Sequence, residues 1–124
     1  MDDLTLIWDD LAFKQLEARD RYTREAISEE IRRMLRQTVP GPQAPAGVEI
    51  DHDLHEYVTG VSDDRFLVVW RLDEGANQAM IKAVVPNTNL VADQSALTTQ
   101  AAVDRFKEQV SRLVDVDLQN LDKP

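Results

Sequence analysis

The sequence predicts an α+β fold: an N-terminal strand and a helical hairpin packed on an antiparallel β-meander, followed by a C-terminal amphipathic helix. Apolar residues recur at helical spacing near the start and the end of the chain, and alternating apolar segments lie between them. The chain has 124 residues, 43% of them hydrophobic, which suffices for the core of one domain. We therefore expect a single domain over 1–124, with a core over 4–90 and a C-terminal helical extension over 95–120.

The N-terminal part predicts one strand and two helices. A short apolar run over 5–8 suits a first strand, and a helical hairpin follows over about 10–18 and 20–37. One long bent helix is the alternative. Asp9 or Asp10 would cap the first helix and Asp20 the second, because a carboxylate there accepts from free backbone N–H groups. Three prolines and two glycines over 40–47 end the helical part in a loop.

Three strands of a meander are expected over 54–61, 64–73 and 77–85. Turn residues separate them at 63–64 and 74–75. In the middle strand, Phe66, Val68, Trp70 and Leu72 share one face and Leu67 and Val69 the other. Both faces are apolar, so this strand should be central and covered on both sides. In the third strand, Ala79, Ile81, Ala83 and Val85 are expected to share one face.

The helix expected over about 98–118 carries one apolar stripe: Ala102, Val103, Phe106, Val110, Leu113 and Val114. Glu108 and Arg112 form an i,i+4 pair on its polar side. Three placements are open. The helix folds back on the uncovered sheet face, which is the common outcome, packs on a second subunit, or receives another protein.

Charge and composition narrow the function classes. The net charge of −9 disfavours a surface that binds nucleic acid throughout, because phosphate contacts need Lys and Arg. Seven of the fourteen basic residues lie within 11–37, so the helical part is mildly basic and the sheet part acidic. The chain has no cysteine, no secretory pattern and no apolar run of about 20 residues. We expect a cytoplasmic protein without membrane contact.

Four segments resemble the RelE/ParE toxin superfamily: LAFKQL at 11–16, the apolar positions from Ala26 to Leu35, DRFLVVWRLD at 64–73 and MIKAVV at 80–85. The resemblance covers about 4–90. It implies small cytoplasmic bacterial toxins that an antitoxin neutralises by wrapping them. RelE-like members cleave messenger RNA in the ribosome, and ParE-like members act on DNA gyrase. The expected partner is thus an antitoxin or a target protein, with nucleic acid only through a ribosome; a homodimer is also compatible.

The resemblance also suggests candidate catalytic residues. Arg65 matches the central-strand arginine of the ribonuclease members and would stabilise charge on a phosphate. His55 or His52 would transfer protons, and Tyr57 would stack on a base. Other basic positions of the family fall near 51–55, which is largely acidic here, and its late Arg/His/Tyr cluster falls near 86–89, which has none of these. The alternative for Arg65 is pairing with Asp63, Asp64 or Glu56.

No metal or cofactor is expected. Asp51, Asp53 and His55 would share a strand face, but the segment lacks the spacing of a zinc motif and suits an acidic surface edge. We expect a toxin-superfamily protein that binds a macromolecular target, with gyrase-type inhibition favoured over ribosome-dependent mRNA cleavage. The alternative is a non-catalytic interaction or regulatory module. If the protein is an enzyme, it is a metal-independent endoribonuclease; a hydrolase using the acidic histidine segment is a weaker idea.

Overall fold

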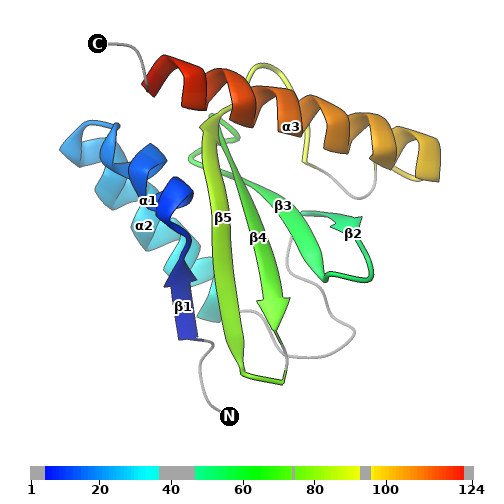
Figure 1. Cartoon of the computed structure of the whole chain (residues 1–124), viewed down its shortest axis with the longest axis horizontal. Helices are drawn as coiled ribbons and strands as arrows, with labels where there is room; N and C mark the ends of the chain where they lie inside the picture. The colour runs from blue at the N-terminus through cyan, green and yellow to red at the C-terminus, as the bar shows by residue number, and fades with distance from the viewer. Residues whose placement is uncertain (1–4, 37–46, 74, 93–95, 122–124) are drawn as a thin grey trace.

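The computed structural model describes residues 5–36, 47–73, 75–92 and 96–121, with the side chains of 34–36 excepted. The elements in chain order are β1 (Thr5–Trp8), α1 (Asp10–Glu17), α2 (Arg21–Arg36), β2 (Val48–Asp51), β3 (Glu56–Val61), β4 (Phe66–Asp73), β5 (Gln78–Pro86) and α3 (Gln100–Leu121). Five strands form one sheet in the order β1-β5-β4-β3-β2, parallel between β1 and β5 and antiparallel elsewhere (Figure 1). The predicted α+β class is confirmed.

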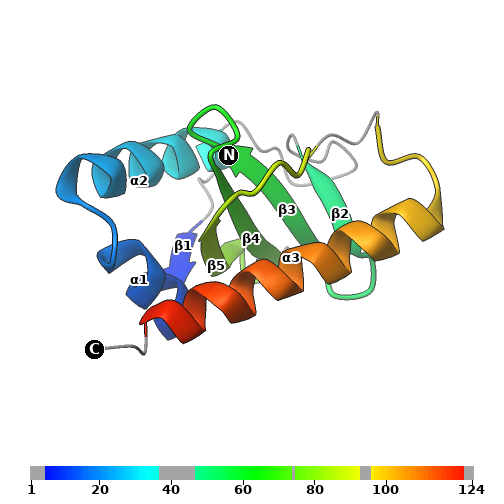
Figure 2. The ribbon, with the colours of Figure 1, turned by 90° about the horizontal axis from the view of Figure 1, so that it is seen from above.

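The sheet is covered on both faces. On one face Trp70 and Val68 pack against Ile27 and Ile31 of α2 and against residues of α1. On the other face, Leu67 and Val69 belong to a second core with Phe106 and Val110 of α3. Figure 2 shows the sheet between α2 on one side and α3 on the other. Of the three placements open for the C-terminal helix, the chain adopts the one on its own sheet.

The position of β4 follows from its sequence. Its inner run of residues from Leu67 to Trp70 is buried, with at most 7% of any residue exposed. Because both faces of this strand are apolar, only the centre of a sheet covered twice can bury them all. The prediction of a central, doubly covered strand is confirmed.

A bulge in β5 makes one sequence expectation wrong. Val69 lies opposite Ala83 but Trp70 lies opposite Ile81, so Lys82 is an extra residue without a partner in β4. Ile81 therefore packs with the helical hairpin, whereas Ala83 faces α3. The four residues expected on one face are divided between the two, because the extra residue shifts the alternation. The short strand β2 was also not expected.

One predicted helix cap is confirmed, and the other is only half right. The Asp20 carboxylate accepts a hydrogen bond from the Thr23 hydroxyl at 2.6 Å and one from its backbone N–H at 3.2 Å. Asp9 occupies the N-cap position of α1, but its side chain makes no capping hydrogen bond. It pairs with Lys82 instead. Three predictions fall on residues outside the described ones: the end of the second helix at 37, the part of the loop over 40–46, and the turn residue Glu74.

An ion pair with little solvent exposure joins the two helical layers at one end of the sheet. The Arg19 Nη2 donates to both carboxylate oxygens of Asp117, at 2.8 and 2.9 Å. The two side chains are 17% and 9% exposed, and the Arg19 guanidinium also lies 5.7 Å from the centre of the Phe66 ring. The last turns of α3 are therefore held to the α1–α2 connection.

We predict that Trp70→Ala lowers the free energy of unfolding by about 3–5 kcal/mol. Trp70 is fully buried, stacks on Tyr57 and donates its indole N–H to the Thr59 hydroxyl at 3.1 Å. Chemical denaturation measures the change. Tyr22→Ala is the control, because Tyr22 is 81% exposed. Equal stability of the two variants would contradict the assignment of Trp70 to the core.

We further predict that Asp117→Ala lowers the free energy of unfolding by about 3 kcal/mol, because it leaves the Arg19 charge unpaired where water reaches it poorly. Glu25→Ala, which removes the exposed partner of Arg21, should cost about 0.5 kcal/mol or less. Urea denaturation of both variants gives the comparison. A loss for Asp117→Ala no larger than for Glu25→Ala would show that the Arg19–Asp117 pair does not secure α3.

Candidate functional site

The three candidate catalytic residues lie in different environments. Tyr57 is 7% exposed and belongs to the core beneath the helical hairpin. Its ring stacks on that of Trp70, with centroids 4.9 Å apart and planes at 24°. To stack on an RNA base, Tyr57 would have to leave this contact.

His55 and Arg65 lie at opposite ends of β3. His55 is exposed in the turn between β2 and β3, and Arg65 is exposed in the turn between β3 and β4. The six residues of β3 that separate the turns span about 20 Å. Arg65 donates to the backbone oxygen of Ser62 at 3.1 Å and to its hydroxyl at 3.0 Å. The structure does not bring the three residues together, and their catalytic role stays a prediction.

The acidic histidine segment forms an exposed turn. The His52 Nδ1 lies 3.0 Å from a carboxylate oxygen of Glu49, and the rings of His52 and His55 lie 6.2 Å apart. Among the described residues, no three His, Cys, Asp or Glu side chains converge as a metal site would require. The sequence suggested Asp63, Asp64 or Glu56 as partners of Arg65. The hydrogen bonds observed for its side chain go to Ser62 instead.

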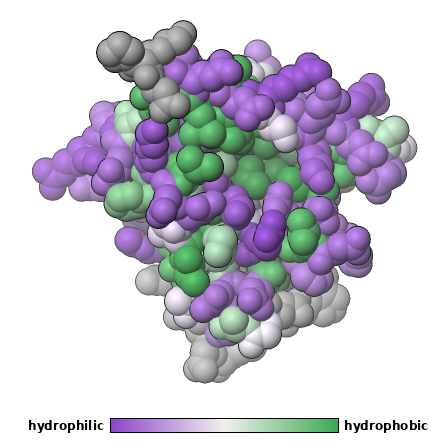
Figure 3. All heavy atoms as spheres, viewed as in Figure 1, coloured by the Kyte–Doolittle hydropathy of each residue, from purple (hydrophilic) through white to green (hydrophobic). Residues whose placement is uncertain are grey.

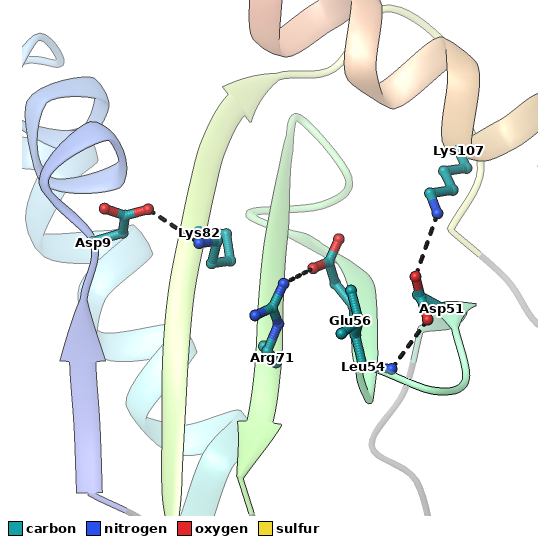
Figure 4. A network of polar contacts seen from close by, with 7 residues as sticks. All are labelled: Asp9, Asp51, Leu54, Glu56, Arg71, Lys82 and Lys107. Carbon is teal, nitrogen blue, oxygen red and sulfur yellow. Dashed lines mark hydrogen bonds and ion pairs between the residues drawn. The ribbon is translucent and has the colours of Figure 1, made fainter.

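Sequence reasoning missed a line of charged residues across the sheet face that α3 only partly covers (Figure 4). We call it the charged row: Asp9, Lys82, Arg71, Glu56, Asp51 and Lys107. Its side chains form three ion pairs. The nitrogen–oxygen distances are 3.3 Å for Lys82–Asp9, 3.1 Å for Arg71–Glu56 and 3.6 Å for Lys107–Asp51. Every cation of the row is thus opposed by a carboxylate.

Strand register explains how the row forms. Glu56 lies directly opposite Arg71 in the β3–β4 pair and also opposite Asp51 in the β2–β3 pair. Directly opposed strand residues have neighbouring side chains on one face, so the Glu56–Arg71 contact follows from the register. These residues continue the alternation of Val58 and Val69, and so lie on the face that α3 covers. The bulge then adds Lys82 from β5.

A crevice of about 210 Å³ lies between α3 and the sheet beside the charged row. Its apolar lining is Ile50, Val69, Ala83, Val110 and Val114. Its polar lining is Glu56, Lys82, Lys107, Ser111 and Asp115. In the space-filling view of Figure 3, hydrophobic surface shows among hydrophilic side chains on this side of the molecule. The row and the crevice share Glu56, Lys82 and Lys107 and therefore form one surface with apolar groups and balanced charge.

Hydrogen bonding sets the ionisation of Asp51. Its carboxylate accepts the backbone N–H of Leu54 at 3.0 Å and faces the Lys107 ammonium at 3.6 Å. The Leu54 hydrogen bond first, and the Lys107 charge second, lower the pKa of Asp51 below its usual value. Asp51 therefore stays ionised to lower pH than an ordinary aspartate does.

We predict that Asp51→Asn makes stability less sensitive to acid. Because the pKa of Asp51 is lower in the folded chain than in the unfolded chain, its contribution is present above about pH 4 and is lost as pH falls further. Thermal unfolding between about pH 2 and 7 measures this. Asp53→Asn, in the same turn, is the matched control. Identical pH profiles for wild type and Asp51→Asn would contradict the proposed role of the Leu54 and Lys107 contacts.

Comparison with known proteins gives evidence on the fold. No protein-family model and no curated protein sequence matches this chain. In the described part of the chain, no helix combines the length and apolar character needed to cross a membrane. The solved structures that match include the isolated E. coli RelE toxin, which is 14% identical, with a TM-score of 0.56, over 88% of this chain and 97% of that one. The chain therefore has a RelE-like fold, as the resemblance implied.

Proposed function

We propose that this protein acts in the manner of the RelE/ParE toxins by binding a macromolecular target, with a gyrase-type protein target favoured over ribosome-dependent mRNA cleavage. The fold supports the toxin assignment, since the similar E. coli protein is described as a toxin. The charged row carries the choice of target. Its three cations all face carboxylates, so they are less available to phosphates than the cations of an RNA-binding surface are.

Electrostatics distinguishes the two modes. RNA cleavage requires cations that stabilise the charge developing on a phosphate, and RNA affinity comes from phosphates neutralised by Lys and Arg. An RNA strand on the charged row would have to replace Asp9, Glu56 and Asp51 as partners of the cations. A protein target could instead match the alternating charges and bury the apolar lining of the crevice. Such a surface favours specific orientation over general attraction to polyanions.

The positions of the candidate catalytic residues support the same choice. Arg65 and His55 lie at opposite ends of β3, so one phosphate could not contact both in this conformation. Tyr57 lies in the core. A protein partner is further proposed because the family pairs its toxins with antitoxins, and both partners would meet in the cytoplasm.

A second candidate function is a non-catalytic interaction module on the same fold. The observation that favours it is the position of α3, which covers one face of the sheet through Phe106 and Val110. This face would then have a structural role, and other surfaces would make the contacts. Expression in a bacterial host separates the candidates, because only a toxin arrests growth.

We predict that induced expression arrests bacterial growth and that Arg65→Ala still does so. Purified protein should inhibit DNA supercoiling by gyrase and leave ribosome-bound mRNA intact. The measurements are colony counts after induction, a supercoiling assay and an mRNA cleavage assay. Cleavage of the mRNA that Arg65→Ala abolishes would contradict the proposal and support the ribonuclease mode. Normal growth on expression of the folded wild type would support the interaction module.

A charge reversal tests the surface itself. Arg71→Glu places two acids opposite each other on β3 and β4 and should weaken target inhibition about tenfold or more, the change that 1.4 kcal/mol of binding energy gives. Arg33→Glu, an equal charge reversal on the exposed side of α2, is the matched control. Circular dichroism confirms that both variants fold. Equal inhibition by the two folded variants would show that the charged row is not the contact surface.

A further inference from the structure

We propose that Gln15 is a positioning residue that holds the β5 bulge and so directs Lys82 into the charged row. The structural part of this inference stands on contacts alone. Its consequence for target binding rests on the proposed function. The bulge matters because it places Lys82, the residue that β5 contributes, in the charged row.

The neighbouring strands β1 and β5 differ in length. β1 has four residues and β5 has nine, and their parallel pairing ends where Trp8 meets Ile81. Just after this last pair, the Asp9 backbone N–H donates a hydrogen bond to the Ile81 carbonyl at 3.0 Å. Beyond Ile81, none of the described strands neighbours β5 on that side, although Val84 and Val85 are fully buried.

Gln15 supplies the acceptor that the missing strand would have provided. Its side-chain oxygen accepts the Val84 backbone N–H at 2.9 Å, and both residues are fully buried. The orientation of the amide follows from chemistry, because an N–H donor can only face the oxygen. A buried N–H without an acceptor is unfavourable, so this contact stabilises β5 where β1 has ended.

In the described structure, only the oxygen of the Gln15 side-chain amide makes a hydrogen bond. Its Nε2 is buried without a partner in the described structure. An apolar side chain of the same length would fill the same space without an unsatisfied donor. What Gln15 adds over such a residue is therefore the acceptor for Val84.

The Gln15–Val84 contact also constrains Lys82. The helix α1 and its N-cap hold β5 on both sides of the extra residue: Asp9 through Ile81 before it, and Gln15 through Val84 after it. Between these fixed points the chain contains one residue more than the facing part of β4. Lys82 is that residue, and its ammonium lies 3.3 Å from the Asp9 carboxylate. Releasing Val84 frees the bulge to move and Lys82 to leave the row.

The test compares Gln15→Met, which keeps the length and removes the acceptor, with wild type. The Lys82 amine is labelled with ¹³C-methyl groups, its signal assigned with Lys82→Arg, and Asp9→Asn gives the signal for a broken pair. In Gln15→Met the Lys82 signal should move toward that of Asp9→Asn. The Val84 amide should exchange with solvent about five- to tenfold faster than global destabilisation explains, as loss of one hydrogen bond predicts.

One control and a second variant keep the result interpretable. Ile27→Val removes core packing on α2 without touching the bulge, and should leave the Lys82 signal unchanged. Gln15→Leu also removes the acceptor while filling the site with an apolar side chain, so it provides the test if Gln15→Met does not fold and should displace the Lys82 signal likewise. An unchanged Lys82 signal in the folded variant without the acceptor would overturn the positioning role.

Target inhibition separates this inference from the proposed function. A displaced Lys82 signal together with weaker gyrase inhibition supports both. A displaced signal with full inhibition supports the role of Gln15 and overturns the assignment of the charged row as the contact surface. An undisplaced signal overturns the role of Gln15 whatever the inhibition, and Arg71→Glu then tests the surface separately.

Discussion

Burial of β4 on both faces is the constraint on which the rest of the structure depends. Val68 and Trp70 can leave water only beneath the helical hairpin, and Leu67 and Val69 only beneath α3. The strand therefore lies third of five, with two strands on each side. Because hydrophobic stabilisation scales with buried apolar area, loss of either helical layer would expose one face of the same strand.

The charged row is a consequence of how far α3 extends over the sheet. Where α3 covers the sheet, the strands present Val58, Val69 and Ala83. Where it does not, the same face presents Glu56, Arg71 and the bulged Lys82. Placing charged pairs at the border lets each cation keep a partner and partial access to water, which avoids the desolvation that fully buried pairs suffer. The surface that results combines an apolar crevice with balanced charge.

The sequence indicated most of the fold and little of the site, for physical reasons. The apolar run in β4 and the helical spacing of Ile27 and Ile31 are local patterns, and both predictions hold. The alternation of side chains along β5 could not locate the bulge, because Lys82 is an extra residue only in comparison with the register of β4. The sequence left Tyr57 as a candidate for stacking on a base, because alternation of apolar residues does not say which face of the sheet a helix covers. The Asp9–Lys82 and Asp51–Lys107 pairs join distant elements and left no local signal.

Native-state hydrogen exchange of the β4 backbone tests the double cover most directly. The amides from Leu67 to Trp70 should exchange only through global unfolding, with the same opening free energy as chemical denaturation measures. Helix α3 is then part of the cooperative core and not a separate attachment. Exchange of these amides at a clearly lower opening free energy than global unfolding would contradict the account.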